Sequence, residues 1–222
     1  MKNNDVIIYT AEGYANAETV GRVDDYTVFV PQMIVGERAK VKLNHVKRNV
    51  AYGTVVELLK ASDKRAKPLC PRFGKCGGCS LMHMSYSEQL LFKRNKVEAN
   101  IRKLAKIDVE VLPCVPSDKT CGYRNKLSLP VSGKCGSVHI GMYERNTHKV
   151  VDTHGCQLGG DWATLLVELF KHPETEFAEV QARLKKIAQI HNEASSIIPA
   201  ACLPPMISIR ATCCMAATLI IW

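Results

Sequence analysis

Three cysteines lie within ten residues in the segment Cys70-Pro-Arg-Phe-Gly-Lys-Cys76-Gly-Gly-Cys79. Thiolates at such short spacing can converge on one soft metal centre, and the chemistries that suit them are an iron–sulfur cluster and zinc. Gly77 and Gly78 lack side chains, so this loop can wrap closely around a bulky centre. Tetrahedral ligation needs a fourth ligand. We expect it to be Cys156, which closes a strand-rich segment and stands just before a predicted helix.

The spacing alone leaves two centres open, a cluster and a zinc knuckle that staples a small domain. His83 and His154 are alternative ligands, although a single histidine is more commonly packed or solvated. The remaining cysteines show no ligand spacing and are expected to be buried thiols: Cys114, Cys121, Cys135, Cys202, Cys213 and Cys214. We expect cytosolic thiols rather than disulfides, because the N-terminus shows no secretory signal and no apolar run is long enough for a membrane span.

The positive charge of the chain is concentrated in one region. The 222 residues carry 30 Lys/Arg and 21 Asp/Glu, a net charge of +9. Residues 61–110 hold eleven Lys/Arg against five Asp/Glu, so two thirds of the excess lies in this segment. Such a concentration favours an anionic partner, with nucleic acid first, and its alternative is a solvated basic face.

The elements that would position these residues begin with short strands in residues 5–60. About five strands in this length predict a small closed barrel of the oligonucleotide-binding type. Alternation in the strand around residues 39–43 places Val41 and Leu43 in the core and their neighbours outside. The candidate phosphate contacts are then Lys40, Lys42, Lys47 and Arg48. An edge strand that uses lysine against aggregation would show the same pattern.

The rest of the chain mixes helices and strands, so the predicted class is α+β, mainly β. Residues 61–69 read as a linker, and Ser85 begins a capping box for a basic helix over 85–104. Its predicted apolar stripe is Leu90, Val97, Ile101 and Leu104. An antiparallel meander is expected over 122–152, and helices are expected from Asp161 and from Pro173. The predicted domains are 1–60, 61–172 and an unassigned, helical tail over 173–222.

The sequence resembles the RNA uridine C5-methyltransferases in the order of its motifs. These enzymes use S-adenosylmethionine and carry a TRAM domain and an iron–sulfur cluster, and they make 5-methyluridine in ribosomal or transfer RNA. The resemblance covers about residues 5–172. It rests on Gly36-Glu-Arg38, the cysteine block, Ser85-Tyr-Ser-Glu-Gln-Leu90, Tyr123-Arg-Asn-Lys126 and Cys156.

The resemblance implies a TRAM barrel that binds RNA. It also implies a four-iron four-sulfur (4Fe-4S) cluster on Cys70, Cys76, Cys79 and Cys156, and RNA contacts at Arg124 and Lys126. Ribosomal or transfer RNA is the implied partner, S-adenosyl-L-methionine is the family's cofactor, and a cytoplasmic monomer without membrane contact is expected.

The resemblance does not extend to the family's catalytic motifs. A Gly-rich cofactor loop, an Asp-Pro-Pro-Arg-like stretch and a Ser-Cys-Asn-Pro nucleophile motif are not recognised in the sequence, so no catalytic residue is assigned. We therefore expect the N-terminal portion of such an enzyme, truncated before the catalytic domain and inactive by itself. The rival hypothesis is a non-catalytic iron–sulfur or zinc module that only binds RNA.

Overall fold

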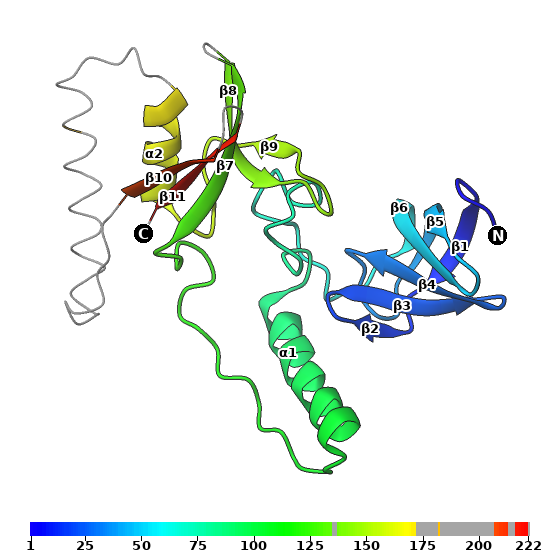
Figure 1. The fold of residues 1–222 in the computed structure, drawn as a ribbon. Coiled ribbons are helices and arrows are strands. Elements are labelled where there is room, and N and C mark those ends of the chain that lie inside the picture. Colours follow the sequence, from blue (N-terminus) through cyan, green and yellow to red (C-terminus); the bar gives the residue numbers. More distant parts are fainter. Residues whose placement is uncertain (135–136, 172–181, 183–206, 213–215, 222) are drawn as a thin grey trace. The chain divides into compact units, whose positions relative to one another are not determined.

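The structure is a computed structural model that describes residues 1–134, 137–171, 182, 207–212 and 216–221 (Figure 1). The chain divides into two compact units. The first consists of Met1–Leu69 and Cys79–Ser117, and the second consists of Cys70–Gly78 and Asp118–Trp222. The basic helix that follows the cysteine block therefore belongs to the same unit as the N-terminal strands.

The first unit contains a curled sheet of six strands in the order β1-β5-β6-β4-β3-β2 (Figure 1). Neighbouring strands are antiparallel except β4 and β6, which pair in parallel. The strands are β1 (Val6–Thr10), β2 (Gly13–Ala15), β3 (Glu18–Val23), β4 (Tyr26–Pro31), β5 (Arg38–Val46) and β6 (Val50–Lys60). The prediction of five strands was wrong by one, because β2 has only three residues and is too short to show alternation.

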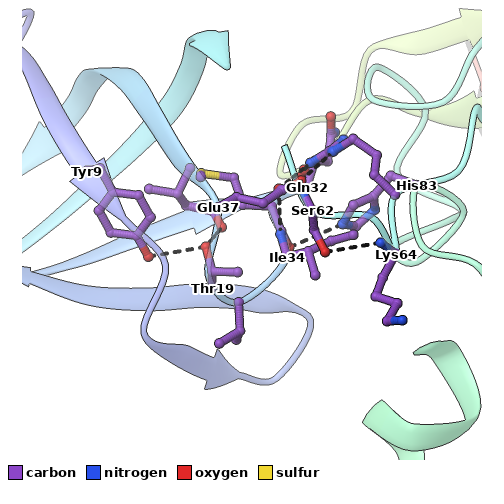
Figure 2. Close-up of polar contacts among 12 residues, drawn as sticks. Tyr9, Thr19, Gln32, Ile34, Glu37, Ser62, Lys64 and His83 are labelled. Atoms are coloured by element: carbon purple, nitrogen blue, oxygen red, sulfur yellow. Dashed lines mark hydrogen bonds and ion pairs between the residues drawn. The ribbon is translucent and has the colours of Figure 1, made fainter. Parts of the chain in front are cut away.

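The core of this sheet contains the residues that the alternation of β4 and β5 directs inward. Val28, Val30, Val41 and Leu43 are fully buried, as is Tyr9 of β1. Figure 2 shows how the hydroxyl of Tyr9 is satisfied in this core, since it donates to Thr19 Oγ1 at 3.1 Å. Thr19 in turn donates to the Val30 carbonyl at 2.8 Å. Burial raises the pKa of Tyr9 to about 12, so the ring stays neutral.

Residues 61–69 were expected to be a linker, but a buried carboxylate binds this segment to the barrel, which corrects that prediction (Figure 2). Glu37, which is 0% exposed, accepts hydrogen bonds from the backbone N–H of Ile34 at 2.8 Å and of Ser62 at 3.0 Å. Arg65 donates to both Glu37 oxygens, through Nε at 2.7 Å and Nη2 at 2.6 Å. Arg65 Nη2 also donates to the Gln32 carbonyl at 2.9 Å.

His83 is buried beside this cluster. Its Nε2 lies 3.2 Å from the Met33 carbonyl, and its own carbonyl accepts from Ala66 N–H at 2.9 Å. Burial lowers the pKa of His83, and the charge of Arg65 adds to this effect. For Glu37, burial acts to raise the pKa, but hydrogen bonds from Arg65, Ser62 and Ile34 outweigh it and leave the pKa lowered.

These shifts predict that acid destabilises the first unit. The pKa of His83 is lower in the folded state than in the unfolded state. The unfolding free energy is therefore highest above about pH 6.5 and falls as the pH drops below that value. The lowered pKa of Glu37 adds a further loss below about pH 4.3. We expect His83→Gln, which cannot titrate, to flatten the dependence between about pH 7 and about pH 5.5. Urea denaturation followed through NMR amide peaks of β4 and β5 measures this.

His45→Gln is the matched control for the acid experiment, because His45 is exposed in the same unit. The control should keep the pH dependence of the parent chain. A His83→Gln chain whose unfolding free energy still falls by the parental amount over the same pH range would contradict the assignment.

Helix α1 (Tyr86–Asn100) begins at the predicted cap, where Ser85 Oγ accepts from Glu88 N–H at 3.4 Å. It continues as a π-helical turn, η1 (Ile101–Ala105), and ends at Lys106 with φ 56°. The predicted apolar stripe was wrong, because Val97 is 48% exposed and Phe92 is the buried residue of α1. Phe92 meets the ring of Tyr14 on β2 edge to face, with centroids 4.9 Å apart. Contact with the barrel, rather than helical periodicity, selects the buried side.

The second unit contains a five-stranded antiparallel sheet in the order β10-β11-β7-β8-β9 (Figure 1). Its elements are β7 (Leu127–Lys134), β8 (Ser137–Tyr143), β9 (Val150–Asp152), α2 (Asp161–Lys171), β10 (Ile207–Thr212) and β11 (Ala216–Ile221). The meander and the helix at Asp161 are as predicted. The tail was expected to be helical, but β10 and β11 extend the sheet instead. The helix predicted from Pro173 lies outside the described residues.

The core of the second unit forms where α2 packs with the sheet. It consists of Leu127 and Leu129 of β7, Ile140 of β8, and Ala163 and Val167 of α2. Within the described part of the chain, no helix combines the length and the apolar character that crossing a membrane requires.

Candidate functional site

The cysteine block forms a tight loop that is attached to the end of β8. Cys76 makes an antiparallel bridge with Glu144, and Gly77 N–H donates to the Tyr143 carbonyl at 2.9 Å. A Cβ atom at position 77 would lie 3.0 Å from that carbonyl oxygen, which is closer than most real Cβ atoms approach a neighbour. Glycine at this position therefore lets the loop reach the strand.

Three of the predicted ligands, Cys70, Cys76 and Cys156, belong to the second unit. Cys76 is half-buried, and Gly78 N–H donates to its Sγ at 3.4 Å. Burial is the main cause that raises the pKa of the Cys76 thiol, and the neighbouring Cys70 and Cys156 raise it further through their charge. Thiolates that repel one another at short range gain most from a bound cation. The donor set of this loop therefore fits a soft metal or an iron–sulfur cluster.

Cys156 is held in place by the turn that precedes α2. Its carbonyl accepts from Gly159 N–H at 2.9 Å and from Gly160 N–H at 3.0 Å, and its side chain packs against the core of the second unit. Cys79 follows Gly78 directly in the sequence and is half-buried. Among the described residues, no three His, Cys, Asp or Glu side chains are grouped as a metal-ion site. The four-cysteine ligand set therefore stays a prediction.

The other candidate ligands have different environments. His83 is a packed histidine of the first unit, whereas His154 is exposed. Cys114 and Cys121 are half-buried rather than buried, which corrects the expectation for these two. The expectations for Cys135, Cys202, Cys213 and Cys214 concern residues outside the described ranges.

The outer face of β5 carries the predicted basic residues. Lys40 and Lys42 alternate with the fully buried Val41 and Leu43, as expected. Lys40 Nζ lies 2.7 Å from Glu57 Oε2 on β6, so a carboxylate already compensates its charge. Lys42 is exposed, and so are the two cations of the turn that follows, Lys47 and Arg48. These three are therefore better placed than Lys40 as candidates for phosphate contact.

Arg124 and Lys126 belong to the second unit, where they precede β7. Arg124 is half-buried, and its backbone N–H donates to the Leu158 carbonyl at 2.8 Å. Lys126 is exposed one residue before Leu127, the first residue of β7. Their part in RNA binding stays a prediction.

An aromatic group lies on the outside of the barrel and was not predicted from the sequence. Phe29, Tyr52 and His45 come from β4, β6 and β5 and face away from the core. The sequence pattern that could have predicted it is the alternation of Phe29 with the buried Val28 and Val30, which directs the Phe29 ring outward.

The comparisons with known proteins agree with the motifs. The family model of the TRAM domain matches residues 5–56. An uncharacterized RNA methyltransferase of Clostridium acetobutylicum is 35% identical over 182 residues, which cover 79% of this chain and 39% of that protein. A second one, from Clostridium tetani, is 35% identical over 77% of this chain and 37% of its own length. One from Listeria innocua is 31% identical over 76% of this chain and 37% of its own length.

A crystal structure of Pyrococcus abyssi tRNA (uracil-54, C5)-methyltransferase in complex with S-adenosyl-L-homocysteine aligns with a TM-score of 0.48 and 24% identity. The alignment covers 73% of this chain and 35% of that one. The chain thus carries a TRAM domain. It is similar to proteins named RNA methyltransferases, which agrees with the resemblance of its motifs, and it spans less than two fifths, 39% and 37%, of the first two relatives' lengths.

Proposed function

We propose that this chain is the RNA-binding and cluster-bearing part of an S-adenosylmethionine-dependent RNA (uracil-C5)-methyltransferase of the cytoplasm. Its substrate is ribosomal or transfer RNA. The observation that carries the proposal is the combination, in one chain, of a TRAM domain with the cysteine loop of this family. The similarity to proteins named RNA methyltransferases extends over both parts.

In this proposal the barrel supplies phosphate contacts. Lys42, Lys47 and Arg48 lie exposed on β5 and the turn after it, where no buried charge has to be desolvated. Contacts of this kind position RNA without reading its sequence. The choice of a uridine would come from other parts of the enzyme, since a reacting base has to be taken out of its stack.

The cysteine loop supplies the second function in this proposal. Cys70, Cys76, Cys79 and Cys156 would hold a 4Fe-4S cluster, which when bound cross-links the loop to the turn before α2. The short spacing and the repulsion among the thiols at Cys76 support this ligand set. The same residues also suit zinc, which belongs to the second candidate function.

That second candidate is a non-catalytic iron–sulfur or zinc module that binds RNA. It is favoured by the one observation that the sequence shows RNA-binding and ligand motifs but none of the family's recognised catalytic motifs. With S-adenosylmethionine and unmethylated RNA, the chain by itself is expected to form no 5-methyluridine under either hypothesis. The two hypotheses are therefore distinguished by the positions on cellular RNA to which the chain binds.

Ultraviolet crosslinking of the chain to cellular RNA, followed by sequencing, is the experiment that tests the proposed function. We expect the crosslinked positions to gather around uridines of ribosomal or transfer RNA that carry a C5 methyl group. Crosslinks spread over RNA without relation to 5-methyluridine would overturn the proposal and favour the non-catalytic module.

The phosphate contacts predict a specific salt dependence. Replacing Lys42 and Lys47 together by alanine should shallow the log–log slope of RNA affinity against salt by about 1.4, at about 0.7 per lost contact on single strands. The affinity should fall about equally for unrelated RNAs. Fluorescence anisotropy over a potassium chloride series measures both quantities.

Lys40→Ala combined with Glu57→Ala is the matched control for this salt experiment. It removes two charged side chains of the same barrel face, but their charges cancel, so the slope should stay parental. If the Lys42 and Lys47 variant binds RNA like the parent at every salt concentration, these lysines are only a solvated face.

A further inference from the structure

Three rings form a row across the outer face of the barrel. Phe29 of β4 stands opposite Tyr52 of β6 in the strand register, and Tyr52 stands opposite His45 of β5. The Phe29 and Tyr52 rings are 5.4 Å apart between centroids and 21° from parallel. The Tyr52 and His45 rings are 6.4 Å apart and 29° from parallel. Three neighbouring strands of the sheet, in the spatial order β5-β6-β4, therefore build one aromatic surface.

This surface is available to a ligand. Tyr52 is 40% exposed, His45 is exposed and Phe29 is half-buried. The residues beside the rings in β4 and β6, Val28 and Ala51, are fully buried, so the core does not need these aromatic side chains. Cross-strand aromatic pairs contribute only modestly to the stability of a sheet. The stability of the sheet alone therefore does not explain why three rings lie on its solvent-exposed face.

The surroundings of the row indicate which ligand it suits. Lys42 and Thr54 form the neighbouring cross-strand pair on the same face of β5 and β6. On the opposite flank, Arg22 pairs with Thr27, two residues before Phe29. Both cations are exposed, and Lys47 follows in the next turn. Rings flanked by exposed cations match a single-stranded nucleic acid, whose bases stack while its phosphates meet the positive charges.

We propose that Phe29, Tyr52 and His45 form a base-stacking site for unpaired RNA nucleotides, with Lys42 and Lys47 beside it for the phosphates. This inference rests on the proposed RNA-binding function and assigns it a site. Stacking tolerates any base, because every base has a π-face. The site would therefore hold a single-stranded segment in place without selecting its sequence.

The test replaces Tyr52 by Val, which keeps the strand propensity and removes the ring. Affinity for a single-stranded RNA oligomer that contains 2-aminopurine is measured by anisotropy over a salt series. Stacking is measured separately by the quenching of 2-aminopurine fluorescence. We expect Tyr52→Val to weaken binding roughly fivefold to a hundredfold, with most of the quenching lost and the salt slope unchanged.

Two variants serve as controls. Tyr52→Phe keeps an aromatic face and should restore both affinity and quenching to near the parental values. Tyr143→Val removes an exposed tyrosine of the second unit and should change neither. NMR amide peaks of β4 and β6 show that the barrel of each variant is folded.

The outcomes separate the stacking site from the function on which it rests. If the parent chain does not bind RNA in a salt-dependent way, the proposed function fails. If the parent binds and folded Tyr52→Val binds and quenches equally well, the stacking site is wrong and the proposed function stands. An equal loss of affinity for fully duplex RNA would also overturn the stacking site, because paired bases cannot stack on the row.

Discussion

When the protein is produced without oxygen, each polypeptide should contain about four iron atoms and about four sulfide ions. The Cys76→Ser variant should lose nearly all of both. Cys70 and Cys156 are near enough to Cys76 to raise the pKa of its thiol, and the Gly78 N–H donates to its sulfur at 3.4 Å. Without it, the remaining thiols lack the ligand at the centre of the loop. Iron and acid-labile sulfide analysis, together with the visible absorbance of the brown protein, measures the effect.

Cys114→Ser is the control for the cluster experiment, since Cys114 is also half-buried but belongs to the first unit. It should keep the iron and sulfide of the parent. Cys156→Ser tests the ligand that is remote in sequence and should behave like Cys76→Ser. One zinc per chain with no acid-labile sulfide would show that the loop is a zinc site, and the cluster proposal would then be wrong.

Replacing Glu37 by alanine should cost the first unit about 3 kcal/mol of unfolding free energy. The change leaves the Arg65 guanidinium and the N–H groups of Ile34 and Ser62 without the carboxylate that accepts from all of them. Arg65 keeps some contact with water, which places the cost at the lower end for broken buried pairs. Urea denaturation followed through the NMR peaks of β4 and β5 gives the value.

Glu57→Ala is the matched control for Glu37→Ala. It breaks an ion pair of similar length, 2.7 Å between Lys40 Nζ and Glu57 Oε2, but both side chains are about half exposed. Exposed pairs contribute at most about 1 kcal/mol, so this variant should unfold nearly like the parent. Equal losses in the two variants would mean that Glu37 does not hold the segment around Ser62 and Arg65 to the barrel.

The features that depend on near neighbours in the chain could be predicted from the sequence. Alternation around Val41 and Leu43 predicts which side of β5 is buried, because successive side chains of a strand point to opposite faces. Ser85 predicts the start of α1, because a cap acts on amides only two or three residues away. The cysteine spacing indicates the ligand loop, and the resemblance of the motifs indicates the TRAM domain. Both are readable for the same reason, because the residues of each lie in one continuous stretch of the sequence.

The features that join distant residues depend on how the whole chain folds. The pairing of β5 with β6 places Glu57 against Lys40, so that the charge of this predicted phosphate contact is compensated, whereas Lys42 stays exposed. The register of β4, β6 and β5 assembles the aromatic row, and the fold of the second unit brings Cys156 to Cys76. Strand register and packing are set by the whole core, so no local pattern contains them. Glu37 shows this most clearly, because its partner Arg65 follows 28 residues later in a segment that reads as a linker.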